Sequence, residues 1–344
     1  FPMTSSRPSV LKELLFDFPN DAGIHLISRS NKSFGDGDSD EEAYSKQFDV
    51  DEDYINCVCA GLTSILKRVG AETAHPALEI GCGTGVFSSA LARSNIFPEC
   101  LITDASRKFL HMTRDRITQT NRLAMDDERV QFALLPDEGL HLLPAESFSL
   151  IAARYVLHHI LDWQSFIGVA AKLLRPNGVL TFEEPCREGF ILQAILVSFL
   201  PTLMESKRRS DGSASNPDFD RVIAKQIKDF VDTIVWYARR DVDKSQHEDK
   251  HLFRVSEIMA VGHKNGLEVE YYPNAGYDTV AFEHSEISFE HELFHNLRVN
   301  FGFGNGIVEI LKEHMSPYLQ MIQDISPNGG SPYVKGVFSC KRIA

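Results

Sequence analysis

Three alternating glycines follow an apolar run near residue 80, and this feature most constrains the fold of the chain. The run 76–80 predicts a buried strand, and apolar residues at helical spacing over 86–92 predict a helix. The turn between them holds Gly81, Gly83 and Gly85, which permit unusual φ angles and leave room for a ligand against bare backbone. A strand, a glycine turn and a helix in this order open a βαβ nucleotide-binding unit.

The spacing of these glycines separates several nucleotide-binding folds. Dinucleotide-binding folds use Gly-x-Gly-x-x-Gly, whereas this chain has Gly-x-Gly-x-Gly. The chain also lacks the Gly-Lys-Ser/Thr ending of a P-loop, which argues against a nucleoside triphosphate. Asp104 follows the next predicted strand about 20 residues after Gly83, where an acid can accept hydrogen bonds from both ribose hydroxyls.

Apolar runs that alternate with helical patterns predict a doubly wound, Rossmann-like α/β core. The predicted sheet has seven strands, at 76–80, 100–103, 130–135, 148–153, 179–183, 267–272 and 334–341. We expect six segments: an N-terminal helical region (1–70), the core (71–186), a helical lid insert (187–250), a return to the core (251–275), a second largely helical insert (276–332) and the last core strand (333–344). The N-terminal region and the two inserts are expected to form a cap over the core.

The acidic composition bears on partners and compartment. There are 48 Asp and Glu residues against 35 Lys and Arg, and the net charge of −13 repels phosphate backbones, so no nucleic acid partner is expected. Six cysteines without paired spacing, and no recognisable signal peptide, favour a reducing cytoplasm. The most apolar run, 190–203, is broken by Pro201, so we expect a buried cap helix and no membrane span. The apolar faces of the inserts suit a homodimer as readily as substrate choice.

Four motifs together resemble those of the class I S-adenosylmethionine (SAM)-dependent methyltransferases, of the type that acts on small molecules. They are Glu-Ile-Gly-Cys-Gly-Thr-Gly at 79–85, Ile-Thr-Asp-Ala-Ser at 102–106, Tyr-Val-Leu-His-His-Ile-Leu-Asp at 155–162 and Leu-Leu-Arg-Pro-Asn-Gly-Val-Leu at 173–180. The resemblance covers 77–185, and 251–272 is similar to a later helix and strand of the family. It implies SAM as cofactor and S-adenosylhomocysteine as product. One departure is Ser149, where the family's fourth strand usually carries an aspartate.

The resemblance also assigns the cofactor site. Asp104 binds the ribose, and Asp137 contacts the adenine, with Glu138 as the alternative. Glu79 contacts the glycine loop or the amino-acid end of SAM; a structural ion pair is the other explanation for a carboxylate in an apolar strand. Family members often place an N-terminal aromatic over the cofactor, which makes Tyr44 a candidate, although helix packing is the favoured explanation for this residue. The full set of expected cofactor-binding residues is Glu79, Gly81, Cys82, Gly83, Gly85, Asp104, Ala105, Asp137, Glu138, Arg154 and Tyr44.

Methyl transfer from a sulfonium is an in-line displacement, in which an enzyme mainly aligns the nucleophile and excludes water. We expect O-methylation of a small molecule first, with C- and N-methylation as alternatives. A hydroxyl or carbon acceptor benefits from a general base, and His158 and His159 follow the fourth strand at the edge where ligands bind. His159 is favoured as that base, against the alternative that both histidines cap the strand or pack. Glu183 and Glu184 end the fifth strand; Glu184 faces a substrate, or either is solvated.

A second motif, His-Glu-Leu-Phe-His at 291–295, fits the His-Glu-x-x-His pattern of zinc peptidases. Residues 296–302 hold no histidine, which leaves Glu309 and Glu313 as the nearby third ligands. We therefore expect these histidines on a lid helix and no metal site. Two alternatives from other classes are a SAM-binding protein that transfers no methyl group, such as a cyclase or binding partner, and a metal-dependent hydrolase that uses His291, Glu292 and His295.

Overall fold

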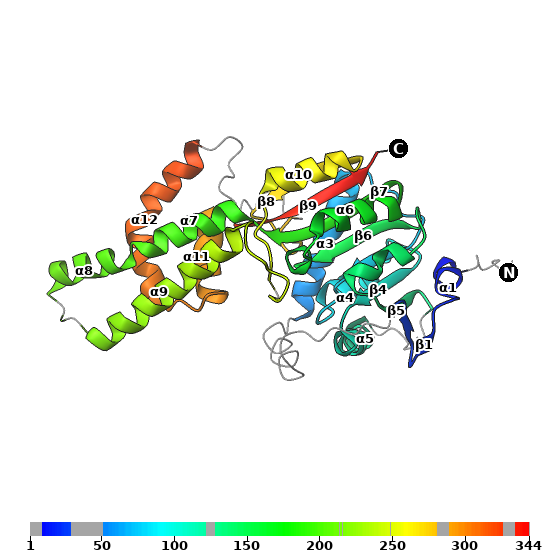
Figure 1. Cartoon of the computed structure of the whole chain (residues 1–344), viewed down its shortest axis with the longest axis horizontal. Helices are drawn as coiled ribbons and strands as arrows, with labels where there is room; N and C mark the ends of the chain where they lie inside the picture. Colours follow the sequence, from blue (N-terminus) through cyan, green and yellow to red (C-terminus); the bar gives the residue numbers. More distant parts are fainter. Residues whose placement is uncertain are drawn as a thin grey trace.

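The structure is a computed structural model that describes residues 9–28, 51–121, 128–212, 214, 216–247, 249–280, 289–325 and 334–343. It shows an α/β body built on one sheet and a body of long helices that stands beside it (Figure 1). The predicted Rossmann-like α/β fold is confirmed.

One mixed sheet forms the centre of the α/β body. Its strands run in the order β1-β2-β5-β4-β3-β6-β7-β9-β8. Their bounds are β1 Asn20–Asp21, β2 Ile24–Leu26, β3 Ala77–Ile80, β4 Cys100–Asp104, β5 Val130–Leu134, β6 Phe148–Arg154, β7 Leu174–Pro185, β8 Leu267–Pro273 and β9 Lys335–Arg342. Strands β2 to β7 are parallel, and β9 runs antiparallel between β7 and β8. The chain order reverses between β3 and β6, and ligands bind at such a switch point, outside the carboxyl ends of the strands.

The prediction of seven strands is wrong, because β1 and β2 add a hairpin at the β5 edge of the sheet. Strand β2 pairs with β5 in parallel, with Ile24 opposite Phe132. Strands of two and three residues are too short to show the alternation from which strands are predicted. The N-terminal region, predicted to be helical, therefore contributes strands as well as the helices α1 (Val10–Leu14) and α3 (Glu52–Arg68).

Helices cover both faces of the sheet. On one face, α3, α4 (Val86–Ser94) and α5 (Arg107–Asn121) share a hydrophobic cluster with the sheet; on the other lie α6 (Trp163–Leu173) and α10 (Val255–Lys264). Leu78 and Ile80 of β3 belong to the cluster that includes α6 and α10, and Ala77 belongs to the cluster that includes α3, α4 and α5. This alternation follows from the two-residue period of a strand. Glu79 shares the face of Ala77, so a carboxylate takes an apolar position in the core.

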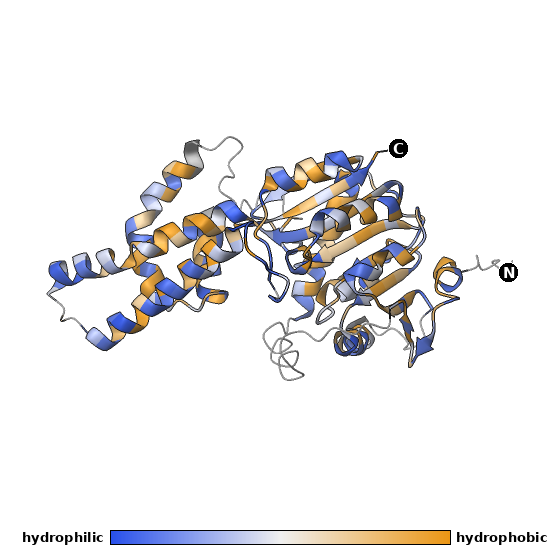
Figure 2. Ribbon diagram, in the orientation of Figure 1, coloured by the Kyte–Doolittle hydropathy of each residue, from blue (hydrophilic) through white to orange (hydrophobic). Residues whose placement is uncertain are grey.

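The two inserts pack together as one helical body. The first contributes α7 (Arg187–Ser198), α8 (Leu200–Asp211) and α9 (Pro217–Ala238), and the second contributes α11 (Phe289–Val299) and α12 (Asn305–Ile325). A separate core holds them, with Val197, Phe230, Leu293 and Leu311 among its buried members. The apolar residues gather where these helices meet, and the ends of α8 and α9 that point away from the sheet are hydrophilic (Figure 2). Because β7 ends at Pro185 and α7 begins at Arg187, this body starts at the carboxyl end of the parallel strands.

The apolar run 190–203 divides into α7 and α8, which meet at Phe199. Within the described residues, Arg187–Asp211 is one helical stretch that is long and apolar enough to cross a membrane by length and composition alone, and 39% of its apolar window is buried. Core helices of soluble proteins meet the same criterion, so this is a weak indication. Ile195 and Phe199 are each 49% exposed, so the expected cap helix is only partly buried.

Candidate cofactor and acceptor site

The three glycines of the turn have distinct roles. All have positive φ angles, of 72° at Gly81, 50° at Gly83 and 83° at Gly85. A β-carbon at Gly81 would collide with the side chain of Val156, and one at Gly85 would lie 2.9 Å from Cα of Thr113. At Gly83 the same carbon would meet nothing within 4 Å. Gly81 and Gly85 therefore permit close packing, whereas Gly83 faces open space in which a ligand can approach the backbone.

Asp104 connects the glycine turn to the end of β4. One carboxylate oxygen accepts a hydrogen bond of 3.0 Å from the Gly83 N–H, and the other accepts one of 2.8 Å from the Ser106 N–H. Ala105, between them, is half-buried. Thr113 donates to the Gly83 carbonyl at 2.9 Å, so the turn is held from two sides. Burial raises the pKa of the Cys82 thiol well above its usual value, so this residue offers its backbone rather than a thiolate.

Glu79 is a buried carboxylate beside this turn. Its side chain is 2% exposed, and within the described part of the chain its Oε2 atom has no hydrogen-bond partner. Burial raises the pKa of Glu79 to about 8; the Ser88 hydroxyl and Arg154 oppose the rise, and the Asp104 charge adds to it. A buried carboxyl oxygen without a partner fits a ligand that brings hydrogen-bond donors and positive charge.

The other expected cofactor residues lie at the same edge or outside the described residues. Asp137 and Glu138 open a 3-10 helix directly after β5, with Asp137 half-buried and Glu138 exposed. The Leu135 N–H donates to the Asp104 carbonyl at 2.9 Å, which brings this turn beside the ribose position. Tyr44 lies outside the described residues. Ser149 sits at the amino end of β6, where its hydroxyl donates to Glu72, so this departure from the family pattern is far along the strand from the ligand edge.

Arg154, expected beside the cofactor, is hydrogen-bonded to two protein groups. Its guanidinium donates to the Glu183 carboxylate at 3.1 Å and to the Tyr54 hydroxyl at 2.6 Å. Tyr155 has a φ of 55°, rare for a bulky residue, and its hydroxyl donates to the other oxygen of Glu183 at 2.6 Å. Although burial opposes it, Arg154 and then Lys335 hold the pKa of Glu183 below its usual value. Glu183 is completely buried, so the expectation that it is solvated is wrong.

The two histidines after β6 lie in a network that joins three segments. The Nδ1 atom of His158 lies 2.6 Å from Oε2 of Glu184, and Oε1 of Glu184 accepts the N–H groups of Val156 and Leu157 at 2.9 and 2.6 Å. Glu184 is also completely buried, which excludes the solvated alternative for it. Asp249, from the loop after α9, lies 3.2 Å from Nδ1 of His159. The histidine rings are 4.0 Å apart between centroids.

Asp249 is the residue of this network that sequence reasoning missed. It is distant from His158 in sequence and lies in a polar loop without a motif, so the sequence gives no signal of where this loop folds. The Lys250 N–H donates to the His158 carbonyl at 2.7 Å and so fixes the two loops together.

The motif at 291–295 is helical, as expected, but its glutamate has another partner. Glu292 is buried and lies 3.6 Å from Nζ of Lys335, which in turn lies 3.8 Å from Glu183. His291 and His295 stack with ring centroids 6.1 Å apart. In the described ranges, the group of His, Cys, Asp and Glu side chains that are close enough to share an ion is His158, His159 and Asp249, not this motif. A hydrolase that uses Glu292 as its base is therefore not supported.

The fold and the glycine turn define a Rossmann-like site for a nucleoside-containing ligand. A family model described as "Methyltransferase domain" matches residues 78–180. The chain is 27% identical over 130 residues to the ubiquinone biosynthesis O-methyltransferase of Pasteurella multocida, and the aligned segment covers 36% of this chain and 51% of that protein. It is 28% identical over 133 residues to the uncharacterized methyltransferase YcgJ of Bacillus subtilis, with 37% and 49% covered.

Two further similarities extend beyond these bacterial proteins. The chain is 26% identical over 155 residues to the reducing polyketide synthase Preu2 of Preussia isomera, and the aligned segment covers 42% of this chain and 6% of that protein. The structure is similar, with a TM-score of 0.47 and 10% identity, to a complex between the Haloferax volcanii Trm112 methyltransferase activator and the putative methyltransferase, covering 89% of this chain and 95% of that one. The chain spans about half, or less, of the length of these curated relatives.

Residues 78–180 match a methyltransferase domain, over which the chain is similar to SAM-dependent methyltransferases, and SAM is the cofactor of such a domain. The residues present fit SAM on two observations: the open space at Gly83 and the unpartnered oxygen of Glu79.

Proposed function

We propose that this protein transfers the methyl group of SAM to a hydroxyl oxygen of a small molecule. The observation that carries the proposal is the contact between Val156 and Gly81, which places the loop of His158 and His159 directly beside the cofactor turn. O-Methylation is favoured over N-methylation because an amine acceptor needs no base of this kind. Relatives named as O-methyltransferases support the same preference.

The cofactor residues divide by the part of SAM that each contacts. Asp104 and the open backbone at Gly83 hold the ribose, and Glu79 holds the positively charged amino-acid end. Asp137, with Glu138 as the alternative, lies toward the adenine. Cys82 and Ala105 contribute backbone, and Arg154 acts by fixing Glu183 and Tyr54 behind the site.

The reaction needs alignment and removal of one proton. SAM supplies a methyl carbon whose bond to sulfur breaks as the acceptor oxygen bonds to it, and the electron pair stays on sulfur. His159 takes the proton of the acceptor hydroxyl, and Asp249 orients its ring at 3.2 Å. His158 has Glu184 on Nδ1 and is 13% exposed against 31% for His159, so His159 is the better placed base. The helical body at the carboxyl end of β7 serves as the lid over the acceptor and excludes water.

Calorimetric titration with SAM and with S-adenosylhomocysteine tests the cofactor site. We expect micromolar binding to the wild type and a loss of about 10- to 100-fold in Asp104→Asn, because hydrogen bonds to a charged group contribute about 1.5–3 kcal/mol. Asp115→Asn, an exposed position on α5, is the matched control and should bind as the wild type does.

Transfer is then measured with SAM labelled in its methyl group and a panel of phenols, alcohols, amines and carbon acids. Labelled phenol or alcohol ethers are the expected product. Products from amines alone would contradict O-methylation. Tight SAM binding without any labelled product would support the alternative of a cyclase or a binding partner, and no binding to either ligand would contradict the methyltransferase assignment.

A further inference from the structure

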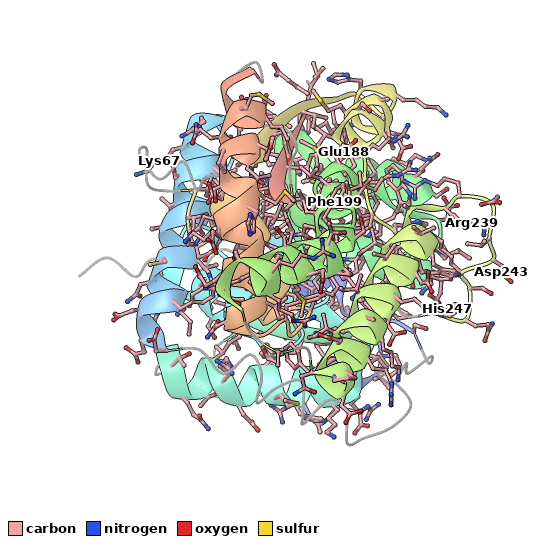
Figure 3. All side chains as sticks on the ribbon, turned by 90° about the vertical axis from the view of Figure 1, so that its left-hand side faces the viewer. Lys67, Glu188, Phe199, Arg239, Asp243 and His247 are labelled. Carbon is pink, nitrogen blue, oxygen red and sulfur yellow. The ribbon has the colours of Figure 1, made fainter. Side chains whose placement is uncertain are left out.

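Three side chains that commonly bind metal ions converge at one point of the acceptor side. His158 and His159 lie in the loop after β6, and Asp249 comes from the loop that follows α9. The loop of Asp249 also carries Arg239, Asp243 and His247, which project outward at the side of the molecule (Figure 3). The hydrogen bond from the Lys250 N–H to the His158 carbonyl, at 2.7 Å, holds the two loops in this arrangement.

The distances between the three groups match those of ligands on a single ion. Oδ1 of Asp249 lies 3.5 Å from Nε2 of His158 and 3.2 Å from Nδ1 of His159. One ligand atom from each residue lies within 4.8 Å of the others. Metal–nitrogen and metal–oxygen bonds of about 2.0–2.1 Å at tetrahedral angles place neighbouring ligand atoms about 3.3 Å apart.

A buried carboxylate stands behind His158, as is usual for a histidine that binds a metal. Oε2 of Glu184 lies 2.6 Å from Nδ1 of His158, so the imidazole presents Nε2 toward Asp249. The other oxygen of Glu184 accepts two backbone N–H groups, from Val156 and Leu157. The completely buried carboxylate at the end of β7 is therefore fixed by the loop after β6 and cannot swing away from the imidazole.

We propose that Nε2 of His158, Nδ1 of His159 and the carboxylate of Asp249 bind one divalent transition metal ion, such as Zn²⁺, Co²⁺ or Ni²⁺. Two imidazoles and a carboxylate suit these borderline cations rather than Mg²⁺ or Ca²⁺, which take oxygen ligands. Three protein ligands leave a position open for water or for a hydroxyl.

The use of this ion rests on the proposed function, whereas the binding itself rests on the geometry alone. An acceptor hydroxyl in the open position loses its proton more easily, because the charge of the ion lowers the pKa of an oxygen bound to it. The proton then leaves to solvent, and the role of His159 changes from base to ligand. If the three side chains form only an imidazolium–carboxylate cluster, the protein has no affinity for a metal ion at this place.

The test is metal titration of purified protein that has been stripped with a chelator and dialysed. Zn²⁺ binding is followed by calorimetry and Co²⁺ binding by its visible absorption, which reports the coordination geometry directly. We expect one ion per chain in the wild type, and binding weaker by about 100-fold or more in His159→Ala and in Asp249→Asn. In Glu184→Gln, which changes only the group behind the ligand, binding should weaken by about 10- to 100-fold.

Two controls locate the ion. His247→Ala changes an exposed histidine on the same loop as Asp249 and should bind as the wild type does. The double variant His291→Ala/His295→Ala removes the histidine pair of α11 and should also leave binding unchanged. Because Asp249 is 48% exposed, Asp249→Asn is expected to fold, and thermal unfolding verifies this.

Each outcome decides the proposal. No metal binding by the wild type overturns it, as does binding that persists in Asp249→Asn but disappears when His291 and His295 are replaced. SAM titration of the same samples separates the two proposals. SAM binding without metal binding removes only the metal site, whereas metal binding without SAM binding removes the proposed function and leaves the site.

Discussion

The buried carboxyl of Glu79 permits a quantitative prediction about stability and pH. Its pKa of about 8 lies well above the 4.5 of an ordinary glutamate, so the folded, ligand-free protein keeps the proton at pH 7. The unfolded chain loses that proton above pH 4.5, and stability therefore falls as the pH rises from 4.5 to about 8. At about 1.4 kcal/mol per pKa unit, this carboxyl destabilises the folded protein by about 3 kcal/mol at pH 7 and by about 5 kcal/mol above pH 8.

Glu79→Gln removes this titration while keeping the size of the side chain. We expect the variant to be more stable than the wild type by about 3 kcal/mol at pH 7, with a difference that approaches zero near pH 4.5. Urea unfolding of the ligand-free proteins across this pH range measures the difference. Glu268→Gln, an exposed position on β8, is the matched control and should show no pH-dependent difference.

The same carboxyl should couple SAM binding to proton release. SAM brings positive charge to Glu79, and a nearby cation favours the ionised form. Binding at pH 7 should therefore release up to about 0.9 proton per chain from the wild type and almost none from Glu79→Gln. Calorimetry in buffers that differ in ionisation enthalpy counts these protons. Equal proton release by the two proteins, together with a stability difference that does not vary with pH, would refute the reasoning.

Three other substitutions test separate parts of the site. Gly83→Ala puts a methyl group into the open space of the turn, where the φ of 50° adds about 1–2 kcal/mol of strain. Calorimetry should therefore show lost SAM affinity, while thermal unfolding shows a folded protein. His159→Gln should lower kcat by about 10²- to 10⁴-fold with SAM affinity unchanged, and a matching loss of SAM affinity would contradict its place on the acceptor side. Glu183→Gln leaves Arg154, whose side chain is 19% exposed, without its counter-charge, so urea unfolding should show a loss of about 3–5 kcal/mol. A loss under about 1 kcal/mol would show that Tyr54 and solvent suffice.

The elements that sequence alone predicted are those set by local patterns. The seven predicted strands all occur, because each is an apolar run bounded by turn residues. The glycine turn was predictable for the same reason, since its positive φ angles are a property of a few adjacent residues. Strands β1 and β2 could not be predicted, because β2 is stabilised by pairing with β5, about a hundred residues away in sequence, and β1 by pairing with β2, and not by a pattern of their own.

The parts of the site that sequence reasoning missed come from charge pairing between distant segments. The resemblance gave Arg154 as a cofactor residue, and only the fold shows that its guanidinium also donates to Glu183 and Tyr54. For Glu183 and Glu184 the sequence left solvation open, because carboxylates are seldom fully buried unless they are paired. Each instead has a charged or polar partner that makes burial tolerable: Arg154 for the first and His158 for the second.

These pairings also show why the inserts matter to the core. Glu292 of α11 pairs with Lys335 at the start of β9, and Lys335 lies 3.8 Å from the Glu183 carboxylate that holds Arg154. Asp249, on the other side, reaches from the end of the first insert to the two histidines. The helical body is thus joined to the ligand edge by charges at two places, and apolar packing holds it together internally. Because charged contacts are specific in direction, they fix where the helical body meets the ligand edge, whereas an apolar contact alone would leave that position less defined.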